Sequence, residues 1–355
     1  MPHVAARTAR TASRDRDTGR YQSHRPEQTL LYQIVDEYYP AFAALMAEQG
    51  KELPGYVQRE FEEFLQCGRL EHGFLRVRCE SCHAEHLVAF SCKRRGFCPS
   101  CGARRMAESA ALLVDEVLPE QPMRQWVLSF PFQLRFLFAS RPEIMGRVLG
   151  IVYRVIATHL VKKAGHTHQV AKTGAVTLIQ RFGSALNLNV HFHMLFLDGV
   201  YVEQSHGSAR FRWVKAPTSP ELTQLTHTIA HRVGRYLERQ GLLERDVENS
   251  YLASDAVDDD PMTPLLGHSI TYRIAVGSQA GRKVFTLQTL PTSGDPFGDG
   301  IGKVAGFSLH AGVAARADER KKLERLCRYI SRPAVSEKRL LRIRLLSIRF
   351  WRTLT

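Results

Sequence analysis

The sequence predicts an α+β protein in which helices flank an antiparallel sheet, preceded by a helical and metal-bound module. Several long segments carry apolar residues at helical spacing, and others are short runs of strand-forming residues bounded by turns. Six of the seven cysteines lie between Cys67 and Cys101, which indicates a metal site rather than disulfides. At 355 residues the chain can form two or three domains.

In the first half of the chain, the apolar pattern of residues 27–65 predicts a helical hairpin that is broken near Pro54-Gly55. Residues 67–105 have few periodic apolar positions, so this part needs metal to hold it together. The elements expected next are a helix at 106–117, a strand at 125–130 ended by Pro131, and a helix at 142–163.

In the second half, strand-like segments 175–182 and 189–201 are joined by a turn-prone link and should pair antiparallel. Residues 220–240 should form a helix with Ser219 as its cap and Gly241 at its end. The remaining expected elements are strands at 269–276, 283–290 and 306–310, a loop at 293–302, and a charged helix at 318–330.

The overall charge indicates a polyanionic partner. Forty-nine Lys and Arg against thirty-five Asp and Glu give a net charge of +14, although charge alone does not separate DNA from RNA or an anionic membrane. The sequence has no run of eighteen apolar residues and no apolar signal segment near the N-terminus, so neither a membrane span nor a secretory signal is expected. Residues 1–28 should be a disordered basic leader.

Two Cys-x-x-Cys pairs predict a structural zinc site. Cys79 and Cys82 are separated by fifteen residues from Cys98 and Cys101, a spacing that suits four thiolates around one Zn²⁺. Cys92 is a further candidate ligand. The roles of the nearby residues that could form a second site, or only fill space, stay open: Cys67, His72, His83 and His86.

The same segment is strongly basic. Between Arg76 and Arg105 there are seven Arg or Lys and two acidic residues. Lys93, Arg94 and Arg95 lie between the cysteine pairs, where they could contact phosphates of a nucleic acid. The alternative is a solvated basic face without a partner.

A candidate catalytic metal site lies at His191 and His193. These two histidines are one residue apart in an apolar, strand-forming run, so both side chains should project from the same side of the strand. Unpaired imidazoles in a buried strand would be costly, which favours a divalent metal as their partner. Taken alone, such a pair can also be purely structural.

A metal that acts on a phosphodiester needs a nucleophile, and Tyr329 is the candidate. A tyrosine would form a covalent intermediate that preserves the bond energy for rejoining, whereas water would make a simple nuclease. Tyr329 lies on the charged helix near Arg325, Arg328 and Arg332, which would attract phosphate.

From residue 30 to 336 the chain resembles the rolling-circle insertion-sequence transposases of the HUH superfamily, particularly the single-tyrosine common-region type. The motifs that carry the resemblance are Phe90-Ser-Cys-Lys-Arg-Arg-Gly-Phe-Cys-Pro-Ser-Cys101, Gln180-Arg-Phe-Gly-Ser-Ala-Leu-Asn187, His191-Phe-His193, and the segment ending in Tyr329.

The resemblance implies an HUH-type sheet on which His191 and His193 bind Mg²⁺ or Mn²⁺. Tyr329 would attack the scissile phosphate and become 5′-phosphotyrosyl DNA, with single-stranded or hairpin DNA at element ends as substrate. The cysteine domain would bind DNA. Gln180 is the first candidate for a third metal ligand, and His310 is the second. Such a protein would be cytoplasmic and nucleoid-associated; its oligomeric state is not predicted.

Two features depart from the family. Relatives with two tyrosines carry them four residues apart, but here that position is Arg325, so a single-tyrosine mechanism is expected. The basic, apolar end at 338–355 differs from the family's continuation, which suggests a truncated or frameshifted product. The expected domains are the leader at 1–28, the helical and zinc-binding DNA-binding domain at 29–110, the catalytic domain at 111–336, and the atypical tail at 337–355.

Two alternative functions stay open at this stage. The chain could be a non-catalytic, zinc-dependent DNA-binding protein in which the histidines are structural. It could also be a rolling-circle replication initiator with the same nicking chemistry, although the sequence has no Gly-x-x-x-x-Gly-Lys-Ser/Thr helicase motif.

Overall fold

The structure is a computed structural model that describes residues 25–94, 96–183, 186–204, 207–245, 250–252, 260–284 and 301–335. The expectations for the leader before residue 25, for Arg95, for most of the strand at 283–290, for nearly all of the 293–302 loop, and for the tail lie outside these residues. The end of the expected leader is folded, because Pro26–Gln28 form a 3₁₀ turn with Pro26 buried.

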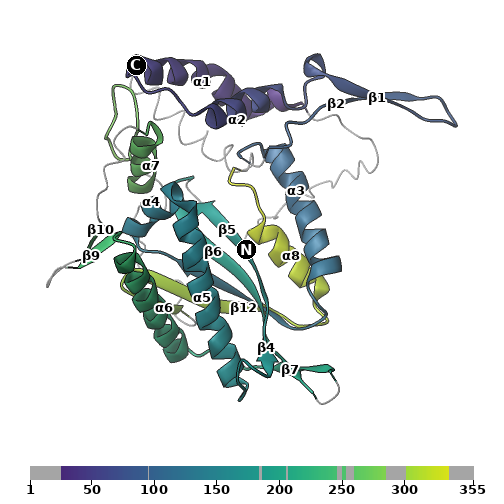
Figure 1. Cartoon of the computed structure of the whole chain (residues 1–355). Coiled ribbons are helices and arrows are strands. Elements are labelled where there is room, and N and C mark those ends of the chain that lie inside the picture. The colour runs from purple at the N-terminus through teal and green to yellow at the C-terminus, as the bar shows by residue number, and fades with distance from the viewer. Residues whose placement is uncertain are drawn as a thin grey trace, which may run out of the picture.

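A five-stranded antiparallel sheet forms the centre of the molecule, in the order β11-β12-β3-β6-β5 (Figure 1). Its strands are β3 (Met123–Ser129), β5 (Ala175–Phe182), β6 (Leu188–Leu197), β11 (Ile301–Val304) and β12 (Phe307–Ala315). β6 pairs with β3 on one side and with β5 on the other. The predicted pairing of the two strand-like segments is therefore confirmed.

One face of the sheet packs against α5 (Pro142–Lys163) and α6 (Ser219–Arg239) to form the main core. Phe192, Met194 and Phe196 of β6 point into this core, together with Trp126 and Leu128 of β3. By length and composition α5 could cross a membrane, but half of its most apolar window is buried inside the protein. This helix therefore behaves as a core helix.

The other face of the sheet packs against α3 (Pro99–Leu112), the π-helical turn Leu113–Val117, and α8 (Arg320–Ile330). Leu195 and Leu197 of β6 contact the buried side of α8, formed by Leu323, Cys327 and Ile330. Because side chains alternate along a strand, His191 and His193 project from this second face. Figure 1 shows α8 lying across it beside β5 and β6.

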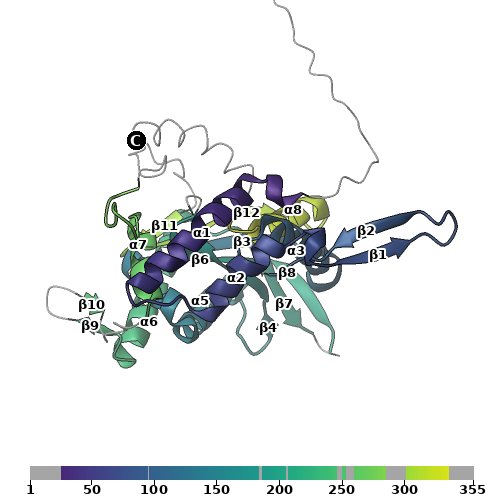
Figure 2. The ribbon, with the colours of Figure 1, turned by 90° about the horizontal axis from the view of Figure 1, so that it is seen from above.

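The N-terminal module consists of α1 (Leu30–Glu48), α2 (Gly55–Gln66) and a hairpin of β1 (Phe74–Arg78) and β2 (Glu85–Ala89). The predicted helical hairpin and its break at Pro54-Gly55 are confirmed. Tyr39 of α1 stacks on Phe61 of α2, with 4.4 Å between the ring centroids. Figure 2 shows the β1–β2 hairpin projecting away from the rest of the molecule.

A smaller sheet of β4 (Ala171–Lys172), β7 (Gly199–Glu203) and β8 (Ala209–Trp213) extends from the far end of β6. There, buried Arg124 of β3 forms a double hydrogen bond with Asp198, at 2.8 Å for each contact, and also donates to the carbonyl of Ala311. This pair ties three strands together at the end of the sheet opposite the histidines.

Several expected elements differ in the structure. The predicted strand at 269–276 is wrong, because Met262–Thr271 form helix α7, whose Ile270 packs into the main core. Its β-branched residues favour a strand locally, but packing against α4 decides the conformation. Helix α4 (Phe132–Ser140), directly after Pro131, was not expected. The short strands β9 (Leu243–Arg245) and β10 (Ser250–Leu252) were not expected either.

The cap of α6 also differs from the expectation. Thr218 caps the helix in place of Ser219, and its hydroxyl accepts from the backbone N–H of Glu221. The Glu221 carboxylate in turn accepts from the Thr218 N–H, which completes a capping box. The expected strand at 189–201 is interrupted at Asp198, where β6 ends and β7 begins.

Candidate active site and metal centres

His191 and His193 lie side by side on the face of β6 that meets α8. Their ring centroids are 4.9 Å apart. In the register of the sheet, Gln180 of β5 lies opposite His191, and Val127 of β3 lies opposite His193. Both imidazoles therefore project from one side, as the alternation of the strand predicts.

Both imidazoles are neutral at neutral pH. Burial, together with the nearby His191 and Arg332, lowers the pKa of His193 to about 3. Burial also lowers the pKa of His191, and Arg332 and Arg135 act in the same direction. Since a metal binds the neutral imidazole, neither ring has to release a proton before it can act as a ligand.

One nitrogen of each ring is engaged by the protein. Nδ1 of His191 donates to the carbonyl of Asn189 at 2.6 Å, and Nδ1 of His193 lies 2.8 Å from Nε2 of Gln125. The remaining nitrogen of His193, Nε2, is buried without a hydrogen-bond partner among the described residues. Such a buried nitrogen is costly, and a bound metal ion would remove that cost. The residues present therefore fit a divalent metal.

Gln125 is a site residue that the sequence analysis did not find. Only 4% of it is exposed, and it lies on β3 beside the histidine pair. As placed, its amide donates to Nδ1 of His193, which puts the ring proton on Nε2. Rotating the carboxamide brings Oε1 to Nδ1 instead and leaves the lone pair of Nε2 free for a metal. A polar residue on the buried face of a strand was the signal that could have revealed it.

Tyr329 lies in the last turn of α8, next to the histidine pair. Its ring centroid is 5.9 Å from that of His193, and the rings meet edge to face. The guanidinium of Arg332 lies 4.3 Å from the centroid of the tyrosine ring. Tyr329 is 47% exposed, so a substrate can reach it. The structure thus brings the predicted nucleophile and the predicted metal ligands into one place.

The two candidates for a third ligand lie in different positions. Nε2 of Gln180 donates to the carbonyl of Ile330 at 2.8 Å, so this side chain links β5 to the end of α8. His310 lies on β12, and β3 separates it from β6, a distance of roughly 10 Å at normal strand spacing. Its ring lies close to Gly312, where an added Cβ would be 2.8 Å from Nε2. Gln180 is the better placed of the two.

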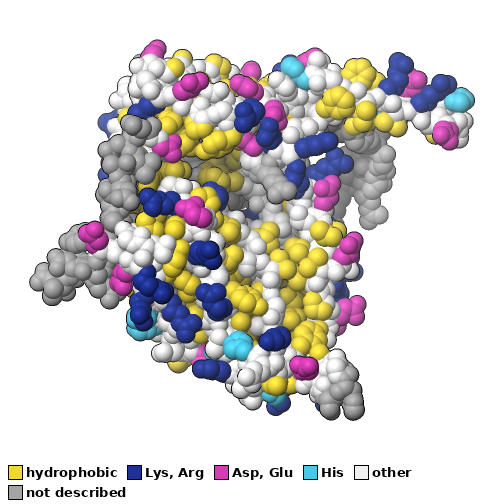
Figure 3. Space-filling model, in the orientation of Figure 1, with side chains coloured by type: hydrophobic (Ala, Val, Ile, Leu, Met, Phe, Trp, Pro, Cys, Tyr) yellow, Lys and Arg dark blue, Asp and Glu magenta, His cyan; other side chains and the backbone are white. Residues whose placement is uncertain are grey.

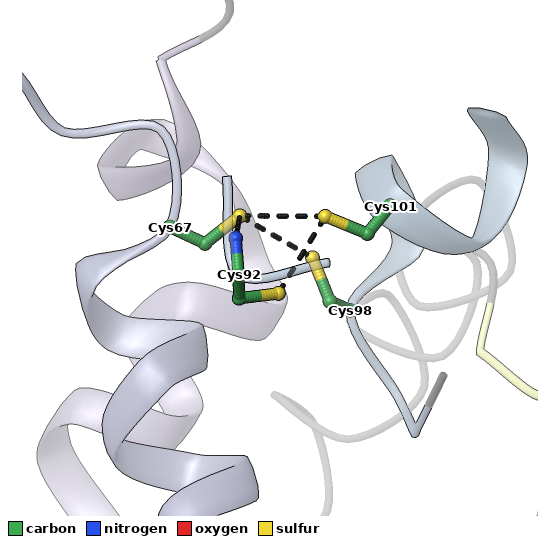
Figure 4. A group of neighbouring side chains, drawn as sticks. All are labelled: Cys67, Cys92, Cys98 and Cys101. Carbon is green, nitrogen blue, oxygen red and sulfur yellow. Dashed lines mark hydrogen bonds between the residues drawn. The ribbon is translucent and has the colours of Figure 1, made fainter. Parts of the chain in front are cut away.

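Four cysteines form a separate cluster in the N-terminal module (Figure 4). Their sulfur atoms all lie within 4.8 Å of one another, a spacing that suits tetrahedral zinc. Cys67 follows α2, Cys92 follows β2, and Cys98 and Cys101 lie at the start of α3. Hydrogen bonds from the other three thiols lower the pKa of Cys101, and the same contacts raise the pKa of Cys92 and Cys98, so Cys101 is the first of the four to ionise.

This cluster corrects the grouping expected from the sequence. Cys98, Cys101 and Cys92 are in it, but Cys67 joins them in place of Cys79 and Cys82. The β1–β2 hairpin carries Cys79 and Cys82 to its exposed tip, away from the other cysteines. Hydrogen bonds from the Ser81 hydroxyl and from the backbone of Cys82 and Ser81 lower the pKa of Cys79 to about 6.

The three basic residues expected to contact DNA have different surroundings. Arg94 forms an ion pair with Glu63 of α2, and this contact lowers the pKa of the Glu63 carboxyl. Arg94 therefore supports the packing of the module. Lys93 is exposed, with a left-handed backbone at φ 52°, and its carbonyl accepts from Arg105. Arg95 lies outside the described residues.

Comparison with known families identifies the class of protein. Residues 174–352 match a family described as "Putative transposase", and residues 34–130 match a transposase zinc-binding domain. The chain therefore belongs to this transposase family. No curated protein and no solved structure matches the chain.

The two matches divide the site residues between them. The first contains the histidine pair, Gln180 and Tyr329, and the second contains the four clustered cysteines and Gln125. The first match runs to residue 352 and so includes most of the segment expected to be an atypical tail. The protein is thus a transposase with a structural zinc site in its N-terminal module.

Proposed function

We propose that this transposase nicks and rejoins single-stranded DNA at the ends of a mobile element, by rolling-circle transposition through a 5′-phosphotyrosine intermediate. The observation that carries the proposal is the position of Tyr329, whose exposed ring lies 5.9 Å from the ring of His193. A tyrosine beside two neutral, convergent imidazoles suits phosphoryl transfer better than a purely structural role.

In this proposal His191 and His193 hold Mg²⁺ or Mn²⁺ through their Nε2 atoms, and Gln180 is the third protein ligand through Oε1. The metal supplies Lewis-acid polarisation of the phosphate oxygens. Gln125 keeps His193 in the required tautomer by accepting from Nδ1. Since Nε2 of Gln180 donates to the carbonyl of Ile330, the same side chain positions the end of α8 that carries Tyr329.

The chemical step is a transesterification at one phosphodiester. Oη of Tyr329 attacks phosphorus and gives up its proton, a new P–O bond forms, and the bond from phosphorus to the 3′ oxygen breaks. The departing 3′ oxygen takes up a proton and becomes a free 3′-hydroxyl. Attack of a second 3′-hydroxyl on the phosphotyrosine reverses the step and joins two strands. Arg332 and Arg135 add positive charge where the phosphate would lie.

Covalent capture tests the proposal. Single-stranded DNA from an element end, labelled on the 3′ side of the cleavage point, is incubated with the full chain and Mn²⁺ and resolved under denaturing conditions. We expect a protein–DNA adduct and a 3′ end on the other fragment that a polymerase can extend. Tyr329→Phe should abolish both products.

Tyr56→Phe is the matched control, because Tyr56 is an exposed tyrosine on α2. This variant should form the adduct at the wild-type yield. DNA binding without any adduct in Mg²⁺ or Mn²⁺ would instead favour a non-catalytic DNA-binding protein. An adduct that survives in Tyr329→Phe would rule out Tyr329 as the nucleophile.

A further inference from the structure

A basic groove lies between α5 and α6, on the opposite side of the sheet from the histidine pair. Its volume is about 380 Å³, and its lining residues are Ile151, Arg154, His231, Arg232, Arg235 and Arg239. Figure 3 shows Lys and Arg side chains gathered over this part of the molecule. The groove is separate from the proposed nicking site, because the main core and the sheet lie between them.

The arginines of the groove form no ion pair with the described part of the protein, although Nε of Arg239 donates to the carbonyl of Arg235. Arg154, Arg232, Arg235 and Arg239 are all exposed, and none forms an ion pair with another described residue. Among the described residues, no acidic side chain lines the groove. Arg232, Arg235 and Arg239 are three and four residues apart on α6 and so lie on one side of that helix. Their like charges repel each other and weaken the helix. An external anion would remove that repulsion.

The side chains that line the groove indicate which form of nucleic acid it suits, single-stranded or double-stranded. Guanidinium groups pair with phosphate oxygens through two parallel hydrogen bonds. Sites for single strands add aromatic side chains on which the bases stack. In the part of the chain that the structure describes, the lining has four arginines but no Phe, Tyr or Trp. It is therefore suited to the backbone of a duplex and offers little for reading unpaired bases.

We propose that this groove binds the phosphate backbone of double-stranded DNA. This rests on the proposed nicking function: the protein holds a duplex flank or a hairpin stem of the element end on the α5–α6 side. The site at Tyr329 receives a single strand on the other side of the sheet. Contacts to phosphates alone make this binding independent of base sequence, so it anchors the DNA without selecting the cleavage point.

The salt dependence of duplex binding tests this proposal. Arg235→Gln/Arg239→Gln removes two contacts, so the slope of log K against log salt for a 30-base-pair duplex of arbitrary sequence should fall by about 1.8. Arg316→Gln/Lys322→Gln is the matched control. It removes the same charge, but these residues pair with Asp318 and Glu319, so its slope should equal that of the wild type.

A single-stranded oligonucleotide of arbitrary sequence separates the two kinds of DNA. Its slope should change little in the groove variant. Equal slopes for duplex binding in the two double variants would overturn the proposal. A fall in the slope for the single strand as large as that for the duplex would also overturn it. Thermal unfolding checks the fold, and the groove variant should melt no lower than the wild type because it removes like-charge repulsion.

The same variants distinguish a failure of this proposal from a failure of the nicking function. The groove variant should form the Tyr329 adduct on a short single strand at the wild-type yield. Absence of any adduct in the wild type would contradict the nicking function. A groove variant that loses the adduct along with duplex binding would contradict the separation of the two surfaces.

Discussion

The cysteine cluster and the histidine pair reach their geometry by different means. The four cysteines come from the end of α2, the loop after β2 and the start of α3, and they pack in a small cluster with a few apolar residues. The two histidines come from one strand, which is paired on both sides and packed against the main core. The first site joins separate segments, whereas the second is built on a rigid strand.

This difference indicates what each metal does for the fold. A small module whose own core is limited depends on its metal for stability. A pair of ligands on an interior strand is already in place before any metal arrives, so in the proposed function the metal at this pair serves the reaction and not the fold. Loss of zinc should therefore unfold structure, whereas loss of the catalytic metal should remove activity alone.

The two regions also meet. Ala334 and Val335, which follow α8, pack into the cysteine cluster, and α3 contacts α8. Gly102 of α3 lies so close to Pro333 that an added Cβ would be 2.6 Å from the proline side chain. The zinc module therefore supports the helix that carries Tyr329.

The largest effect is expected from loss of zinc. Structural zinc contributes on the order of 10 kcal/mol to the folding of small domains, so Cys98→Ser should unfold the N-terminal module. Calorimetry should show the module's transition lost while that of the sheet domain remains. Cys79→Ser/Cys82→Ser is the control and should keep both the zinc at the cluster and the transition. A module that stays folded without zinc would contradict this role.

The next effect concerns Gln125. Residues that orient a metal-binding histidine typically contribute roughly 10–100-fold to metal affinity, so Gln125→Ala should weaken Mn²⁺ binding by about that factor. Gln125→Glu should keep or raise the affinity, because a carboxylate accepts from Nδ1 of His193 in either orientation. Titration followed by electron paramagnetic resonance measures both. Equal affinities in all three proteins would show that Gln125 does not position the ring.

The smallest effect is expected from Gln180, whose two roles can be separated. Gln180→Glu keeps an oxygen ligand but loses the hydrogen bond to the Ile330 carbonyl. Loss of this bond should lower the free energy of unfolding by about 1 kcal/mol. Hydrogen exchange should then be faster at the end of α8, with Mn²⁺ affinity retained. Gln180→Ala should lose both properties. If Gln180→Ala bound Mn²⁺ as well as the wild type, Gln180 would be no ligand.

The difference between the cysteine cluster and the histidine pair also explains how much of each site the sequence could predict. On β6 the two-residue period fixes which side chains share a face, so the shared face of the two histidines was predictable. β5 and α5 were predictable from their apolar patterns, and α8 was predictable as a charged helix. The expected zinc ligands were grouped by spacing alone, but spacing does not show that the hairpin carries Cys79 and Cys82 away from the cluster. Gln125 lies far from the histidines in sequence and meets them only through strand pairing.

The central claim is that His191, His193 and Tyr329 form one metal-centred nicking site. Diffraction from crystals soaked in Mn²⁺, recorded at the manganese absorption edge, tests this most directly. The account predicts one anomalous peak within bonding distance of Nε2 of both histidines, with Oη of Tyr329 close enough to share a bound phosphate with the ion. A peak bound elsewhere, or a tyrosine hydroxyl beyond reach of that phosphate, would contradict it.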